Sequence, residues 1–208
     1  MSRKSNKIIY GDVNLQSLHL RELPDLSDVL IDGAFECFNN LLTSLIGSPR
    51  NVQHHFLCFT NRLTDLKGSP IYVGGDFNCG NNRLTTLEGG PLDVHGIYSC
   101  HANNLTSLKG CPGIIKSSFN CSNNNLVTLE HGPIRVYGNF NCHENKLTSL
   151  KGAPNLIYGD FFCTNNKLTS LEGCPYEVFN DFYCENNAVK FTESQIRAVC
   201  KVKGDVYV

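Results

Sequence analysis

The 208-residue sequence has no tryptophan, a single methionine and no apolar run of the roughly 18 residues that would suggest a membrane span. It also lacks an excess of charge, since 18 Lys and Arg residues oppose 19 Asp and Glu residues and leave a net charge of −1. General nucleic-acid coats and polybasic membrane binders need a strong positive field. The composition therefore argues against both classes, and no membrane partner is expected.

An export signal is missing as well. The first residues, Met1 to Lys7, are basic, but the apolar segment of a secretory signal does not follow them. The chain has 11 cysteines, an odd number, and disulfides persist mainly in oxidising compartments. We therefore expect a cytoplasmic protein with reduced thiols.

A 21-residue repeat dominates the sequence. The cysteines that recur at this interval are Cys37, Cys58, Cys79, Cys100, Cys121, Cys142, Cys163 and Cys184. An aromatic residue stands two places before each of them, and an asparagine stands three places after each. Leucines follow at five and eight places and a proline at twelve in seven of the eight copies. Such agreement predicts that each repeat is one turn of a solenoid.

The fixed period explains the columns of like residues. The aromatic residue and the cysteine are two places apart, so both point to the same side of a strand. Stacked coils place identical residues on top of one another, and aromatic, cysteine and leucine side chains then form interior ladders. The asparagine lies where the strand turns, and its amide can bond the backbone of its own and adjacent coils. The prediction is a β-solenoid of about nine stacked 21-residue coils with one parallel sheet.

The core of a repeat, such as Phe77-x-Cys79-x-x-Asn82-x-Leu84, resembles the LxLxxNxL core of leucine-rich repeats. The coil length and the Leu-Thr-Ser-Leu-x-Gly-x-Pro tail resemble the short leucine-rich repeats of bacterial effectors and bacteriophage proteins. The resemblance covers residues 11–190. It implies a solenoid that recognises a protein, which in a phage or pathogen setting would be a host protein. For a phage-encoded chain it implies the host-cell cytoplasm as the location.

The repeat also predicts how a single domain is organised. Residues 1–32 form an N-terminal cap and a degenerate first coil, with Leu15 in the cysteine place. Residues 33–190 form eight repeats, and residues 191–208 form a C-terminal cap.

The C-terminal cap is predicted to contain a short helix. Thr192-Glu193-Ser194-Gln195 is a capping-box pattern, which favours a helix starting there. Ile196, Val199 and Val202 would supply the apolar face of this helix. The segment 206–208 would form a last strand.

Catalytic and metal-binding patterns are weak. There is no CxxC pair, and a ladder spreads its thiols along a line instead of converging four ligands on one ion. His101 and His143 share a column with Ser122, but a carboxylate that would orient a base is not beside them. The sequence predicts no catalytic residue, no metal and no cofactor. A hydrolase that uses His101, Ser122 and His143 remains an alternative.

The outward columns carry the functional information. The residues one place before and one place after each cysteine face outward, and they are polar in the middle of the stack and aromatic at its ends. The predicted partner-binding residues are Phe38, Leu57, Phe59, His101, His143, Phe162 and Tyr183. The first three should form one exposed cluster and the last two another, as at protein contacts. The alternative is that residues 16–32 fold over the first cluster and the cap helix covers the second.

Two charged columns complete the pattern. The residues nine places after the cysteine alternate in sign: Lys67, Glu88, Lys109, Glu130, Lys151 and Glu172. This alternation favours a structural role, because it pairs opposite charges on adjacent coils. Four places after the cysteine runs a basic stripe of Arg62, Arg83, Lys146 and Lys167, which two asparagines interrupt. Such a stripe could follow a phosphate backbone.

The preferred function is therefore a non-enzymatic module that binds an unidentified protein through its outward aromatic residues. Nucleic-acid binding along the basic stripe is an alternative. Self-association through an open end of the solenoid, which would give a homodimer, is another.

Overall fold

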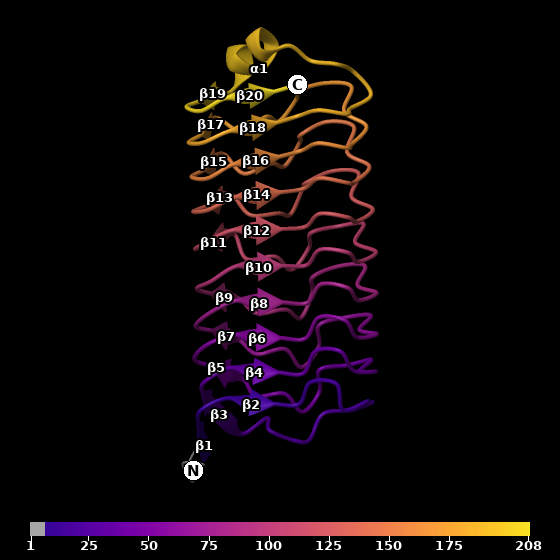
Figure 1. Ribbon diagram of the computed structural model, residues 1–208, viewed down its shortest axis with the longest axis vertical. Helices are drawn as coiled ribbons and strands as arrows, with labels where there is room; N and C mark the ends of the chain where they lie inside the picture. The colour runs from indigo at the N-terminus through magenta and orange to yellow at the C-terminus, as the bar shows by residue number, and fades with distance from the viewer. Residues whose placement is uncertain (1–6) are drawn as a thin grey trace.

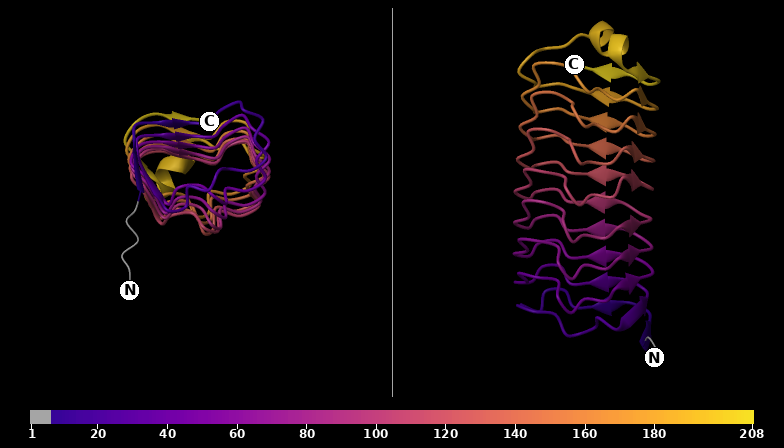
Figure 2. Two further views of the ribbon diagram at one scale, coloured as in Figure 1. Left: turned by 90° about the horizontal axis from the view of Figure 1, so that it is seen from below. Right: turned by 180° about the vertical axis from the view of Figure 1, so that it is seen from behind.

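The computed structural model describes residues 7–208, which form one stack of short coils. The coils lie one above the other with the two chain ends at opposite ends of the stack (Figure 1). Viewed along the axis, the coils overlay closely (Figure 2). The parallel β-solenoid confirms the predicted fold class and the resemblance to short leucine-rich repeats at the level of fold.

A ten-stranded parallel sheet runs the length of the stack. Its strands are β2 (Val13–Asn14), β4 (Phe35–Glu36), β6 (Phe56–Leu57), β8 (Phe77–Asn78), β10 (Tyr98–Ser99), β12 (Phe119–Asn120), β14 (Phe140–Asn141), β16 (Phe161–Phe162), β18 (Phe182–Tyr183) and β20 (Val206–Tyr207). From β4 to β18 each strand pairs with the one 21 residues further on. The stack has ten coils, one more than the nine predicted, because β20 completes a further coil beyond the repeats.

The prediction of a single sheet is wrong, because two five-stranded parallel sheets form a second wall of the solenoid. One contains β1 (Lys7–Tyr10), β3 (Val29–Asp32), β5 (Asn51–Val52), β7 (Tyr72–Val73) and β9 (Asp93–Val94). The other contains β11 (Ile114–Ile115), β13 (Arg135–Val136), β15 (Leu156–Ile157), β17 (Glu177–Val178) and β19 (Lys201–Val202). A valine or isoleucine six places before each ladder cysteine is buried, and this branched column explains the second set of strands.

The interior consists of the predicted ladders. The aromatic rings two places before the cysteines are fully buried, with neighbouring centroids 5.4 Å apart for Phe35 and Phe56 and 5.6 Å apart for Phe119 and Phe140. The thiols also have a polar role beyond filling space. Five of them donate weak hydrogen bonds to a carbonyl of the next coil, as from Cys163 Sγ to the Tyr183 oxygen over 3.2 Å.

The asparagine ladder joins successive coils, as predicted. Asn124 Nδ2 donates to the carbonyl oxygens of Cys100, Cys121 and Ser122, each over 3.1 Å. Its Oδ1 accepts the backbone N–H of Leu105 over 2.9 Å. One buried side chain therefore satisfies four backbone groups of two coils, which a turn inside the molecule requires.

The second turn of each coil depends on glycine at one point. Gly110 has a φ of +94°, a conformation that residues with a Cβ rarely adopt. A Cβ there would lie 2.4 Å from the backbone carbon of Leu87 in the preceding coil. Glycine therefore permits both the turn and the close stacking of coils.

Of the predicted N-terminal cap, residues 1–6 lie outside the described residues, and the first coil is described from residue 7 onward. The pairing of Val13 with Phe35 and the bond from the Leu15 N–H to the Glu36 oxygen place Leu15 in the cysteine column, where it packs partly buried against the core.

The helix α1 (Glu193–Val199) confirms the capping box, because Gln195 N–H donates to Thr192 Oγ1 and Thr192 N–H donates to Gln195 Oε1. Ile196 is buried as predicted. The prediction for Val199 is wrong, since its side chain is 53% exposed, and Val202 lies in β19 instead of the helix. A helix of seven residues has fewer than two turns, so only Ile196 reaches the core.

Replacing Asn124 with alanine should lower the free energy of unfolding by roughly 2–4 kcal/mol, because the buried Leu105 N–H loses its acceptor and three carbonyl groups each lose one of their two donors. Urea denaturation followed by circular dichroism measures the change. Asn104, exposed in the same turn one coil earlier, is the matched control. An equal loss in Asn104→Ala would contradict the role assigned to the asparagine ladder.

Tyr98 is the one tyrosine in the aromatic ladder, and its buried hydroxyl has no hydrogen-bond partner among residues 7–208. Replacing it with phenylalanine, the residue found in the other repeats, should raise the free energy of unfolding by about 1 kcal/mol. The same urea measurement tests this, and a destabilised Tyr98→Phe variant would show that the hydroxyl has a partner.

Candidate functional site

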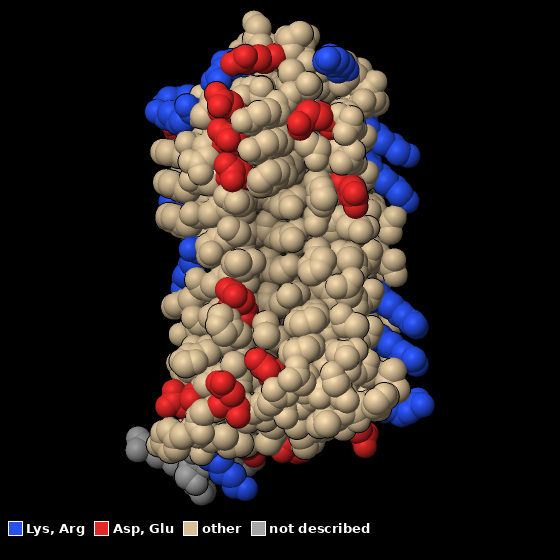
Figure 3. Space-filling model, in the orientation of Figure 1, with Lys and Arg blue, Asp and Glu red and all other residues tan. Residues whose placement is uncertain are grey.

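The outward face of the ten-stranded sheet is the candidate site. Its centre bears few charged side chains, while acidic residues form a column to one side of the centre and basic residues lie along both edges (Figure 3). The strands are in register, so outward residues of successive coils form straight columns. Large side chains in these columns therefore lie directly above one another.

Near the N-terminal end, the rings of Phe38 and Phe59 are stacked with centroids 4.4 Å apart. We call this pair the N-terminal stack. Leu57 lies on the same face in β6, and all three side chains are half-buried. Residues 16–32 do not fold over this cluster: the Ser17 N–H donates to the Phe38 oxygen, and the segment forms the coil below.

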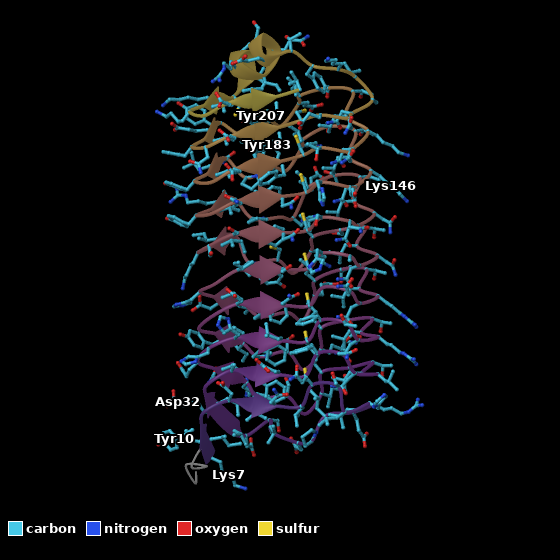
Figure 4. The ribbon with its side chains drawn as sticks, viewed as in Figure 1. Lys7, Tyr10, Asp32, Lys146, Tyr183 and Tyr207 are labelled. Carbon is cyan, nitrogen blue, oxygen red and sulfur yellow. The ribbon has the colours of Figure 1, made fainter. Side chains whose placement is uncertain are left out.

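Near the C-terminal end, Phe162 and Tyr183 are stacked with centroids 4.6 Å apart, and Tyr207 continues the stack at 4.5 Å from Tyr183. We call these three residues the C-terminal stack. Figure 4 shows Tyr183 and Tyr207 one above the other on the sheet. The helix α1 does not cover the stack, because it lies at the end of the solenoid (Figure 1).

A column of hydrogen-bond acceptors borders the C-terminal stack. Asn139 Oδ1 accepts the N–H of Asp160 over 2.9 Å, Asp160 Oδ1 that of Asp181 over 3.2 Å, and Asp181 Oδ1 that of Asp205 over 2.8 Å. We call the three aspartates the aspartate column. Gly159 makes room for the first of these contacts, since a Cβ there would lie 2.1 Å from Asn139 Oδ1.

The aspartates also affect the nearest ring. The Tyr183 hydroxyl donates to Asp181 Oδ2 over 3.3 Å. Partial burial and the negative charge of Asp181 raise the pKa of Tyr183 to about 12. Tyr183 is therefore a neutral hydrogen-bond donor throughout the physiological pH range.

The middle of the face contains the two histidines. Ser99 Oγ lies 2.9 Å from His101 Nδ1, and Asn81 Nδ2 lies 3.5 Å from His101 Nε2. Partial burial lowers the pKa of His101. Among the described residues, the serine hydroxyl within hydrogen-bond distance of the His101 ring is that of Ser99, and the second ring nitrogen faces an amide that would not orient a catalytic base. The backbone N–H of His143 donates to Asn141 Oδ1.

The basic stripe is exposed. Its members Arg62, Arg83, Lys146 and Lys167 occupy the turn after the strands. Lys146 projects from the edge of the solenoid in Figure 4. The stripe consists of two pairs, separated by the two coils that carry Asn104 and Asn125 at this place.

A third aromatic stack lies on the second wall and was not predicted. Tyr137, Tyr158 and Phe179 are stacked with centroids 4.9 and 4.6 Å apart, and all three are exposed. We call them the wall stack. They stand five places before the ladder cysteines, on the second wall that the repeat pattern did not predict.

The thiols are poorly suited to chemistry. All 11 cysteines are free, and the eight ladder cysteines are buried. Burial raises the pKa of Cys37 to about 12 and raises those of Cys58, Cys79, Cys100, Cys121, Cys142 and Cys163 as well. Their reactive thiolate is therefore scarce near neutral pH.

Residues 7–208 contain neither a cluster of metal ligands nor a membrane-spanning helix. Within residues 7–208, no three His, Cys, Asp or Glu side chains gather as a metal site would require. In the same part of the chain, no helix combines the length and apolar character that crossing a bilayer needs.

Comparison with known proteins yields a distant structural likeness. No family model matches the chain, and no curated protein sequence matches it. Among solved structures, it is similar to YopM from Yersinia enterocolitica WA-314, with 18% sequence identity and a TM-score of 0.44. The likeness covers 85% of this chain and 47% of that chain, so this chain spans about half the length of YopM. A likeness this distant supports no statement about function.

The raised thiol pKa values predict alkaline instability. An unfolded thiol ionises near pH ~8.5, whereas the folded protein keeps the seven ladder thiols from Cys37 to Cys163 protonated to higher pH, because burial raises their pKa values. The unfolded state thus releases protons first, and stability that is complete below pH ~8.5 declines as the pH rises towards the folded pKa. The slope can reach about 1.4 kcal/mol per pH unit for each thiol.

Urea unfolding with reductant present, at a series of pH values from neutral upward, measures this decline. Cys121→Ala should show a shallower slope than the natural chain. A free energy of unfolding that stays constant through pH ~10 would contradict the burial of the thiols.

Proposed function

We propose that the protein is a non-enzymatic module that binds another protein through the outward face of its ten-stranded sheet. The observation that supports this proposal is the pair of aromatic stacks at the two ends of that face. Aromatic side chains that leave water on association contribute strongly to protein interfaces.

The N-terminal stack and Leu57 would provide one set of anchors. The C-terminal stack would provide the other, with Tyr207 added to the predicted Phe162 and Tyr183. His101 and His143 lie between the stacks, where they would supply polar contacts. The stacked rings are ordered before binding, so little side-chain freedom is lost when the partner docks.

The partner is a protein of the cell in which this chain acts, and a host protein if a phage or pathogen produces the chain. The cytoplasm is the expected compartment. Nucleic-acid binding has less support, because the basic stripe is interrupted and lies at the edge of the solenoid instead of beside the aromatic residues. Self-association through an end of the solenoid would give a homodimer, and light scattering at two protein concentrations tests this prediction.

Affinity capture with matched variants tests the proposal. The variants are Phe38→Ser with Phe59→Ser for the N-terminal stack, and Phe162→Ser with Tyr183→Ser for the C-terminal stack. The natural chain should retain specific proteins from a cell lysate, and the amount retained should be lower by about tenfold or more with at least one of these variants.

The wall stack provides the control, because Tyr137→Ser with Tyr158→Ser removes two stacked rings from a different surface. Capture should be unchanged in that variant, and circular dichroism should show all variants folded. Equal capture by all four proteins would refute the assignment of the sheet face as the binding surface.

A further inference from the structure

The aspartate column lies directly beside the C-terminal stack. Each aspartate precedes one ring of the stack by two places in the chain. Asp160 precedes Phe162, Asp181 precedes Tyr183, and Asp205 precedes Tyr207. Figure 3 shows a column of acidic side chains near the C-terminal end of this face. The three rings are therefore bordered along one side by three carboxylates.

The aspartate column stacks charges of the same sign, whereas the charges nine places after the ladder cysteines alternate in sign. There, Lys109 Nζ lies 2.9 Å from a carboxylate oxygen of Glu88, and Lys151 Nζ lies 3.1 Å from one of Glu130. In the described part of the chain, the aspartate column forms no ion pair within 4.0 Å. Adjacent coils are about 4.8 Å apart, so like charges repel along the column.

The fold does not need this charge. Asn139 occupies the same column and accepts the next N–H over 2.9 Å without a charge, and Ser118 Oγ does so over 3.0 Å one coil earlier. An uncharged acceptor is therefore sufficient for stacking. Apart from the hydrogen bond that Asp181 Oδ2 accepts from the Tyr183 hydroxyl, the stacking of the coils makes no use of the negative charge of the three aspartates.

A fourth carboxylate lies on the same face. Glu185 follows Cys184, two places after Tyr183, and lines a shallow pocket of about 280 Å³ together with Lys190 and Phe191. Its Oε2 is enclosed and accepts no hydrogen bond from residues 7–208. Acidic groups thus stand on both sides of the last rings.

We propose that the C-terminal stack and the aspartate column bind an arginine-bearing extended segment of the partner, an inference that rests on the proposed function and names the chemistry of its ligand. The aliphatic stem of arginine packs along the rims of the rings. The guanidinium donates two parallel hydrogen bonds to a carboxylate, and it loses its hydration more readily than an ammonium group. Binding relieves the repulsion along the column.

The spacing fits two arginines. The three rings span two centroid steps of 4.6 and 4.5 Å along the stack. Alternate residues of an extended segment lie about 6.6 Å apart and point to the same side. A segment with arginines at alternate places can therefore present both guanidinium groups to three carboxylates.

The test uses the full chain and a fluorescent peptide with two arginines separated by one glycine, followed by anisotropy at low and at high salt. The first variant combines Asp160→Asn, Asp181→Asn and Asp205→Asn, which keeps the Oδ1 acceptors and removes three charges. The control combines Glu88→Gln, Glu130→Gln and Glu172→Gln, which removes three charges from the turns. The expected result is saturable binding that weakens about tenfold in the aspartate variant and less than about twofold in the control.

Three outcomes would overturn the inference. The first is that the natural chain does not bind the arginine peptide at low salt. The second is that both variants lose affinity equally, and the third is that a peptide with lysines in the same places binds as tightly. If the arginine peptide fails while lysate capture still depends on Phe162 and Tyr183, the inference falls and the proposed function stands. If the peptide binds while lysate capture is the same for the natural chain and for every stack variant, the proposed function falls.

Discussion

The structure depends on one constraint: the backbone groups of each coil must meet the same groups of the next coil. The Cys121 N–H donates to the Asn141 oxygen over 2.9 Å, and the Cys142 N–H donates to the Phe162 oxygen over the same distance. From β4 to β18, coils of equal length continue this register without interruption, and the end steps of 22 and 24 residues place their extra residues outside the paired strands. The asparagine ladder extends the bonding into the turn, where strand pairing has ended. The constant 21-residue step in the sequence is therefore the direct consequence of a hydrogen-bonding requirement.

This constraint also determines where function can arise. The residues that look most reactive, the ladder thiols and the turn amides, are used inside the stack, and burial raises the pKa values of the seven ladder thiols from Cys37 to Cys163. What remains free to vary is the outward face. There, the C-terminal stack and the aspartate column combine apolar area with charge that stacking does not require. A rigid scaffold with one such surface suits recognition better than catalysis, because it offers prearranged contacts.

Much of the fold could be predicted because interior columns repeat with little change. The outward clusters around Phe38 and Phe162 could also be predicted, since strands alternate their side chains. The second wall was missed although a branched residue precedes every ladder cysteine by six places. The acceptor column was missed because His55, Asp76, Ser118 and Asn139 look like varied surface; what they share is an acceptor for the next N–H. Tyr207 could not be placed, because the last step is 24 residues and contains a helix.

Amide hydrogen exchange at the turn leucines tests the central claim most directly. The N–H groups of Leu105, Leu126 and Leu147 lie outside the strands and donate to the Oδ1 atoms of Asn124, Asn145 and Asn166. If these side chains join the coils, the leucine amides should exchange as slowly as the strand amides of Phe119 and Phe140. Exchange at the rate of an exposed loop would contradict the account.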